Sequence, residues 1–331
     1  MSSGPFVFSQ LPPELLREVF EHAAQSDTKT ALALSLVSSW TRQWVEPLLY
    51  HTVVLSTAPA LRSFANALSH KPSTFAHDRV KNLGIFAQGP VQSIEQVLDA
   101  CTGVDSLACG FTVASTKQLQ SHPAIQSPDC PKEQHLLGMA CRDGWDPTIV
   151  APSVTHLRVH LPSSPNARLP IHRSNSSNEE QEVTGWDVLS NLPALTHLAI
   201  VYRPSKDYPI DSIFLDLQHL LEAPPQSSSS SDHTAEDSPN SKPDIHLILV
   251  QVAGLPSAQS SAVKTLNDAA LEAGGESLRI VAERAPSSAV VQWEEAVREG
   301  KSVWQDAEEV VKKRMSKEKE EKAVVGAEVT H

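Results

Sequence analysis

Glycine, aromatic residues and long apolar runs are scarce in this chain of 331 residues, which has 13 glycines and 5% aromatic residues. The phosphate-binding pattern Gly-x-x-x-x-Gly-Lys-Ser/Thr, the dinucleotide-binding pattern Gly-x-Gly-x-x-Gly and the hydrolase pattern Gly-x-Ser-x-Gly are all missing. No apolar run approaches the roughly 20 residues of a membrane-spanning helix. The start of the chain, MSSGPFVFSQ, does not resemble a secretory signal. We therefore expect a non-enzymatic protein of the cytoplasm or nucleus.

Cysteine is also rare, with only Cys101, Cys109, Cys130 and Cys141. No two of them have the short spacing of a zinc-binding or redox pair, and four cysteines in a chain of this size do not indicate a disulfide framework. Cys130, His135 and Cys141 could be imagined as zinc ligands, but their spacing matches no familiar arrangement. We expect reduced cysteines, no metal ion and no cofactor.

Positively charged residues are fewer than negatively charged ones: the chain has 27 lysines and arginines and 39 aspartates and glutamates, which gives a net charge of −12. Nucleic acids and anionic membranes attract concentrated positive charge. The sequence therefore argues against nucleic acid and membrane partners. With 40% hydrophobic residues, the chain can still bury a core and form two domains of ordinary size.

The most informative segment of the chain lies at residues 10–51. Pro12 and Pro13 suit the first turn of a helix, which should begin near Pro13 and carry a wide apolar face. Asp27 or Thr28 is a suitable N-cap for a second helix, expected to extend to Trp40. The second helix is apolar on more than one side, so one side could pack inward while another faces a partner.

The segment contains, in this order, Leu11-Pro12, Leu15-Leu16, Val19-Phe20, Leu36-Val37 and Trp40. Their order and spacing resemble an F-box, as found in F-box-like proteins of fungi. The resemblance implies that the module docks on a Skp-type adaptor, which joins the protein to a cullin-RING ubiquitin ligase. It assigns eight positions to the docking face and its support: Leu11, Pro12, Leu15, Leu16, Val19, Phe20, Val37 and Trp40.

Short strand-like segments recur beyond the module, and two of them, VTHLRV and LTHLAI, are nearly copies. They place His156 and His197 at equivalent positions, which could line a recognition surface if they face outward. Helix-like stretches separate the strands, which predicts parallel strands with crossover helices. The predicted strands are residues 51–55, 80–86, 104–109, 154–161, 195–201, 245–252 and 277–282. Their spacing is irregular, which is typical of a degenerate leucine-rich-repeat-like solenoid with insertions.

We therefore predict an α/β protein with an all-α F-box-like module, a leucine-rich-repeat-like solenoid at 52–311 and C-terminal helices. Residues rich in serine, proline and asparagine, at about 162–183 and 223–243, should form flexible insertions. The mixed charge run at 312–331 is expected to be a disordered tail.

Three functions remain open at this point. The first is a substrate receptor of an SCF-type cullin-RING ligase, in which the repeat region binds an unknown protein target. The second is a scaffold whose helical module only caps the solenoid, and it predicts no exposed apolar face on the module. The third, an enzyme, would require Cys130, His135 and Cys141 to converge within ligand distance.

Overall fold

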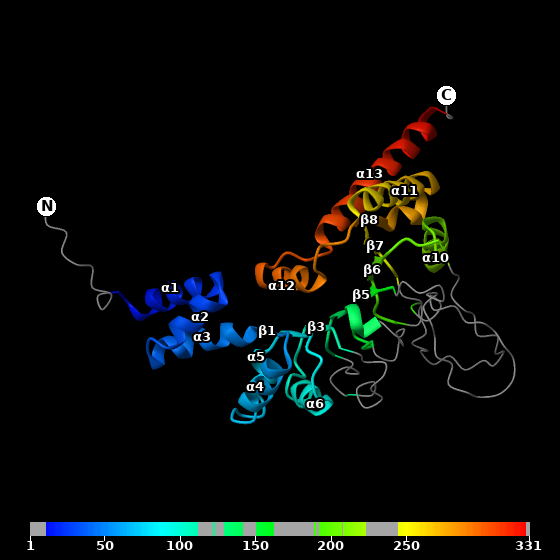
Figure 1. The fold of residues 1–331 in the computed structure, drawn as a ribbon. Helices are drawn as coiled ribbons and strands as arrows, with labels where there is room; N and C mark the ends of the chain where they lie inside the picture. Colours follow the sequence, from blue (N-terminus) through cyan, green and yellow to red (C-terminus); the bar gives the residue numbers. More distant parts are fainter. Residues whose placement is uncertain are drawn as a thin grey trace, which may run out of the picture.

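The computed structural model describes residues 11–111, 122, 129–141, 150–161, 189, 192–206, 208–222 and 244–328. It shows a mixed α/β protein built on an eight-stranded parallel sheet, with a helical module at the N-terminus (Figure 1). The α/β class is therefore confirmed. The predicted insertions at 162–183 and 223–243 lie outside the described residues.

The N-terminal module consists of α1 (Pro13–Ser26), α2 (Thr28–Ser35) and α3 (Ser39–His51). The predicted start at Pro13 is confirmed, as is Asp27, whose side chain caps α2 by accepting hydrogen bonds from the backbone N–H groups of Lys29 and Thr30. The prediction that the second helix continues to Trp40 is wrong. Ser38 adopts an extended conformation and caps a third helix by accepting from the Thr41 N–H.

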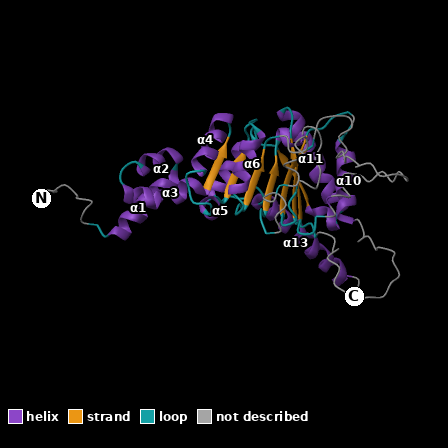
Figure 2. Cartoon of the chain, turned by 90° about the horizontal axis from the view of Figure 1, so that it is seen from below, coloured by secondary structure: helices purple, strands orange, loops and turns teal. Residues whose placement is uncertain are grey.

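The strands pair in sequence order, and every pair of neighbours is parallel (Figure 2). They are β1 (Thr52–Leu55), β2 (Asn82–Ile85), β3 (Ser106–Cys109), β4 (Glu133–Leu136), β5 (His156–His160), β6 (His197–Tyr202), β7 (Leu247–Val252) and β8 (Ile280–Arg284). Each of the seven predicted strands overlaps one of these. The sequence prediction missed β4, because EQHL is short and mostly polar and so lacks the apolar signal of a buried strand.

One face of the sheet forms the main hydrophobic core. Leucine, isoleucine and valine side chains at alternate strand positions, such as Leu83, Leu157, Leu198 and Ile248, point into it. The elements that follow or cover the strands on this side are α4 (Ala58–Leu68), α5 (Phe75–Arg79), α6 (Val91–Ala100), α10 (Ile210–Glu222) and α11 (Pro256–Ala273), with short 3₁₀ turns at Gly138–Cys141 and Gly275–Arg279. Of the helix-like stretches in the sequence, those at 60–68, 93–101, 211–221 and 260–273 coincide with α4, α6, α10 and α11 and are confirmed. The stretches at 113–120 and 185–192 lie almost entirely outside the described residues.

The opposite face, which we call the α12 face, is covered by the end of the chain. Helix α12 (Ala289–Glu299) lies across the strands on the side away from α4 and α6 (Figure 1). Trp293 of α12 is fully buried, and its indole N–H donates to the Ser106 hydroxyl of β3 at 3.0 Å. Trp304, just after α12, is also buried and donates to a carboxylate oxygen of Glu133 in β4 at 2.9 Å. The C-terminal segment therefore packs on strands that precede it by more than 150 residues.

The expected disordered tail at 312–331 is largely helical instead. Helix α13 runs from Gln305 to Glu328, so the prediction is wrong over residues 312–328. Opposite charges four residues apart, such as Glu318 and Lys322 at 3.1 Å, support a helix whose side chains are mostly in solvent. Glu318 also accepts a hydrogen bond from the Gly275 N–H at 3.0 Å, which attaches the helix to the sheet domain.

Substitution of Gly84 should reveal how closely α12 approaches β2. A Cβ atom at Gly84 would lie 2.5 Å from Cζ3 of Trp293, a contact that requires the ring or the helix to move. We expect Gly84→Ala to lower the free energy of unfolding by about 1–3 kcal/mol, measured by urea denaturation. In a double variant with Trp293→Leu, the extra cost of Gly84→Ala should shrink, because the smaller side chain relieves the overlap. Strictly additive costs would contradict this close packing.

Candidate partner-docking site

The N-terminal module exposes large apolar side chains that no described residue covers. Leu15 and Val19 are 47% and 51% exposed on α1, and Val37 and Trp40 are 64% and 65% exposed around the start of α3. Leu36, in the turn before α3, is 77% exposed. We call these five residues the module patch. Concentrated exposed apolar surface of this kind is typical of a contact with another protein.

Helices α1 and α3 hold the module patch together. Phe20 of α1 stacks on Trp44 of α3 with ring centroids 6.3 Å apart, and Trp44 contacts the Trp40 ring edge-on at the same distance. Below them, Ala24, Ala31 and Val45 form the small buried core of the module, as their exposed fractions of 5%, 2% and 0% show. The aromatic contacts join the two helices where Val19 and Trp40 are exposed, so residues from both helices can meet one partner.

The eight residues predicted for docking divide by exposure. Leu15, Val19, Val37, Trp40 and Pro12 are exposed. Leu11, Leu16 and Phe20 are partly buried and support the helices from beneath. The eight predicted positions did not include Leu36, which lies in a turn before α3 where the sequence analysis expected a continuous helix. Ser38, a strong N-cap residue type, was the signal that could have revealed the turn.

Two open clefts separate the module from α12. One has a volume of about 580 Å³ and lies between Asp27, Thr28 and Leu48 of the module and Glu295 and Arg298 of α12. The other, of about 620 Å³, is lined by Leu32, Arg42 and Tyr50, with Phe64 of α4 and again Arg298. Leu32, although 53% exposed, therefore faces this cleft and is kept separate from the module patch.

The zinc site considered for Cys130, His135 and Cys141 is not assembled. The Cys141 thiol donates to the Leu136 carbonyl oxygen at 3.3 Å, and burial raises the pKa of the Cys109 and Cys141 thiols to about 12. Protonated buried thiols are poor nucleophiles and poor metal ligands. In the described part of the chain, ligand atoms of three such groups converge only at His156, His197 and Glu308.

His156 and His197 do meet on neighbouring strands, but they do not form an open recognition surface. Their rings stack with centroids 4.1 Å apart and an interplanar angle of 10°. The Trp304 ring lies edge-on to both, and the His197 side chain is only 13% exposed. The equivalent positions in VTHLRV and LTHLAI therefore pack beneath the C-terminal segment.

A buried polar relay crosses the same face. Arg158 is fully buried and donates to the Gln251 side-chain oxygen, and the Gln251 amide donates to Glu283 at 2.6 Å. Burial lowers the pKa of Arg158 to about 10, so the guanidinium stays charged at neutral pH. Gln251 thus connects the buried Arg158 guanidinium to the Glu283 carboxylate through two hydrogen bonds. We assign these hydrogen bonds a structural role.

No protein-family model matches this sequence, and no curated protein sequence matches it. None of the helices in the described residues is both long enough and apolar enough to cross a membrane.

Proposed function

We propose that this protein is a substrate receptor of an SCF-type cullin-RING ubiquitin ligase, whose N-terminal module binds a Skp-type adaptor. The observation that carries the proposal is the module patch of Leu15, Val19, Leu36, Val37 and Trp40, exposed by between 47% and 77%. Four of these five positions are among those that the F-box resemblance assigns to docking. The proposal keeps the expected location in the cytoplasm or nucleus.

The alternative function, a scaffold capped by the module, fits the exposure less well. A module that serves only as a cap should bury its apolar residues against the sheet domain. Here Val45 and Ala31 are buried inside the module while the patch remains in solvent. The exposed patch therefore favours a partner over a cap.

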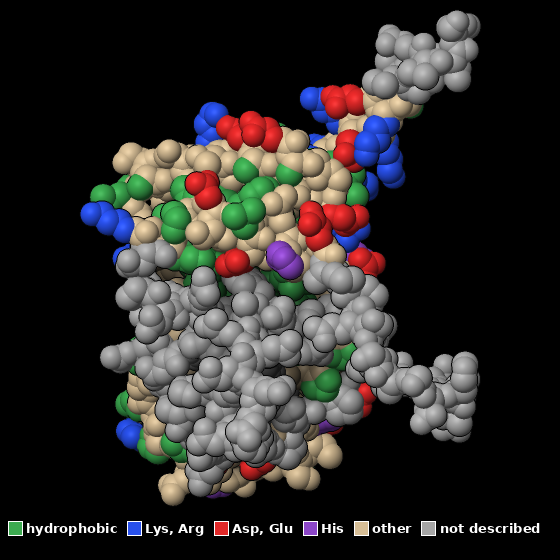
Figure 3. All heavy atoms as spheres, turned by 90° about the vertical axis from the view of Figure 1, so that its right-hand side faces the viewer, with side chains coloured by type: hydrophobic (Ala, Val, Ile, Leu, Met, Phe, Trp, Pro, Cys, Tyr) green, Lys and Arg blue, Asp and Glu red, His purple; other side chains and the backbone are tan. Residues whose placement is uncertain are grey.

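The remainder of the chain suits a platform for a target protein. Eight parallel strands in strict sequence order, with helices on one face, support the interpretation as an irregular leucine-rich-repeat-like solenoid. Because α12 and Trp304 cover the other face of the sheet, the proposal assigns target binding to outer surfaces. One of these, the side that carries α10 and α11, presents hydrophobic and charged side chains interspersed (Figure 3), with Leu215, Leu255 and Leu271 exposed.

The direct test is binding between the purified full-length protein and a purified Skp-type adaptor. We expect a stable complex on size-exclusion chromatography, with one adaptor for each chain, and a dissociation constant measurable by calorimetry. Failure of the folded full-length protein to bind any Skp-type adaptor would reject the receptor function and leave the scaffold. Circular dichroism on the same sample verifies that the protein is folded.

A further inference from the structure

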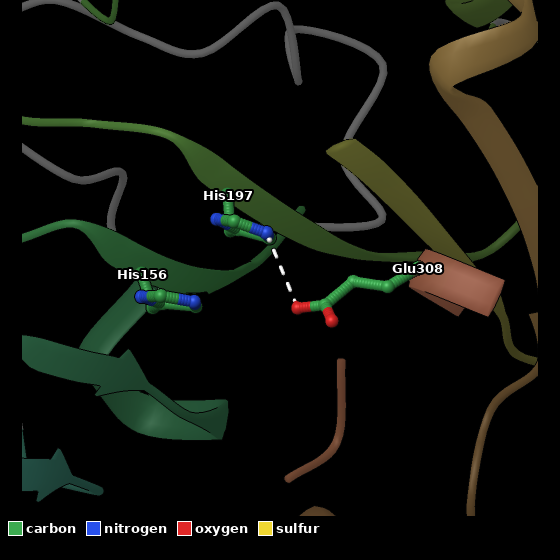
Figure 4. A group of neighbouring side chains, drawn as sticks. All are labelled: His156, His197 and Glu308. Carbon is green, nitrogen blue, oxygen red and sulfur yellow. Dashed lines mark ion pairs between the residues drawn. The ribbon is translucent and has the colours of Figure 1, made fainter. Parts of the chain in front are cut away.

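His156, His197 and Glu308 come from three separate elements and meet on the α12 face. His156 and His197 are register partners on β5 and β6, and Glu308 lies one turn after Trp304 on α13. The Nε2 sides of both imidazoles point toward the Glu308 carboxylate (Figure 4). One nitrogen or oxygen atom from each of the three residues lies within 4.8 Å of the other two.

The threonine before each histidine sets the imidazole tautomer. The Thr155 hydroxyl donates to the Lys132 carbonyl oxygen at 3.1 Å and lies 2.9 Å from Nδ1 of His156. In the repeat of this arrangement, the Thr196 hydroxyl donates to the Thr155 carbonyl oxygen at 3.1 Å and lies 2.8 Å from Nδ1 of His197. Each hydroxyl has only one hydrogen, which it donates to a carbonyl oxygen. Its oxygen can therefore only accept a hydrogen bond from the histidine, so Nδ1 carries the ring hydrogen. Both Nε2 atoms then carry a free lone pair on the side of Glu308.

In this arrangement the Nε2 lone pair of His197 faces the lone pairs of the Glu308 carboxylate. Nε2 of His197 lies 3.3 Å from Oε1 of Glu308, a contact that is an ion pair only when the imidazole is protonated; in the neutral tautomer set by Thr196, Nε2 carries no hydrogen. The contact becomes favourable when a positive ion lies between them. Histidine nitrogens oriented by a second hydrogen bond at Nδ1 are the usual ligands of transition metals in proteins.

The distances agree with a tetrahedral ion. Two ligands that each lie about 2.0–2.1 Å from Zn²⁺ are roughly 3.3–3.4 Å apart at the tetrahedral angle. The His197–Glu308 separation of 3.3 Å falls in this range. The His156 ring is stacked nearly parallel on the His197 ring, so it must rotate to direct its Nε2 lone pair at the same ion, from a position where its ligand atom already lies within 4.8 Å of the other two. The Glu308 side chain is 48% exposed, which leaves a fourth position open to water.

We propose that His156, His197 and Glu308 bind a divalent transition-metal ion, with Zn²⁺ the best match to two imidazoles and one carboxylate. The ion holds helix α13 against strands β5 and β6, so it fastens the C-terminal segment over the α12 face. This site is separate from the module patch, and its test is independent of adaptor binding.

The test uses the full-length protein, treated with a chelator that is then removed, and titrated with Co²⁺ alone and then Zn²⁺ alone. We expect about one equivalent of Co²⁺ to give the intense visible absorption of a tetrahedral complex, and Zn²⁺ to displace it. Glu308→Gln, which removes the charge and keeps the shape, should weaken Co²⁺ affinity at least about tenfold. Thr196→Val should weaken it by about 10–100-fold, because the His197 ring loses its orientation.

Glu309→Gln is the matched control, because Glu309 is the next residue on the same helix and its side chain is 71% exposed. It should bind Co²⁺ as the unaltered protein does. No tetrahedral absorption with the unaltered protein, or equal affinity in Glu308→Gln and Glu309→Gln, would overturn the proposal. The Glu308 and Glu309 side chains are 48% and 71% exposed, so neither substitution disturbs the buried core and both variants should fold.

Discussion

Replacing Leu15 and Val19 together by aspartate should abolish binding of the Skp-type adaptor without unfolding the protein. Both side chains are about half exposed, at 47% and 51%, so the new carboxylates stay hydrated in the free chain. In the complex they would be buried without a partner. A loss of at least about 3 kcal/mol follows, which is more than a hundredfold in affinity.

The matched control places the same change elsewhere on the surface. Leu215 on α10 and Leu271 on α11 are 63% and 53% exposed, and Leu215→Asp with Leu271→Asp adds the same charge as the module variant. Affinity for the adaptor, measured by calorimetry, should be retained in this control. If Leu15→Asp with Val19→Asp bound the adaptor as well as the control did, the module patch would not be the docking surface.

Trp293→Ala should produce the largest loss of stability. The Trp293 side chain is fully buried, and its ring contacts Phe86 edge-on at 5.8 Å between centroids. Truncation leaves a cavity between α12 and the sheet, and also leaves the Ser106 hydroxyl without its indole donor. We expect the free energy of unfolding to fall by about 3–5 kcal/mol in urea denaturation followed by circular dichroism.

Two further tryptophan variants separate the causes of this loss. Trp293→Phe keeps most of the packing and removes only the indole donor, so it should cost clearly less than Trp293→Ala. Trp40→Ala removes a ring that is 65% exposed, and we expect a cost of about 1 kcal/mol or less. Equal losses for Trp293→Ala and Trp40→Ala would contradict the role of Trp293 as the anchor of α12.

Strands and helix ends that depend on residues close together in the sequence could be predicted from the sequence. The segment 245–252 predicted a strand close to β7, because parallel strands buried on both faces are nearly continuously apolar. The segment 154–161 predicted one close to β5, because Leu157, Val159 and Leu161 alternate with polar residues. Asp27 marked the start of α2, since its side chain caps the helix. Gly300 ends α12 with a positive φ of 70°, the conformation in which glycine commonly stops a helix.

Contacts between distant parts of the chain could not be predicted in the same way. Nothing near Trp293 or Trp304 in the sequence indicates that their partners are Ser106 and Glu133, 187 and 171 residues earlier. The convergence of Glu308 with His156 and His197 has the same origin, because it depends on where α13 returns to the sheet. The eight positions predicted for docking could be named from the sequence because they lie within one short segment.

The return of the C-terminal segment to early strands also sets an order for folding during synthesis. Strands β1 to β8 can pair one after another as they leave the ribosome, because each needs only its sequence neighbour. Trp293 and Trp304 leave the ribosome 187 and 171 residues after their partners Ser106 and Glu133, so the α12 face of β3 and β4 stays uncovered during that interval. A nascent chain thus presents these early strands to chaperones and proteases until Trp293 and Trp304 pack against them.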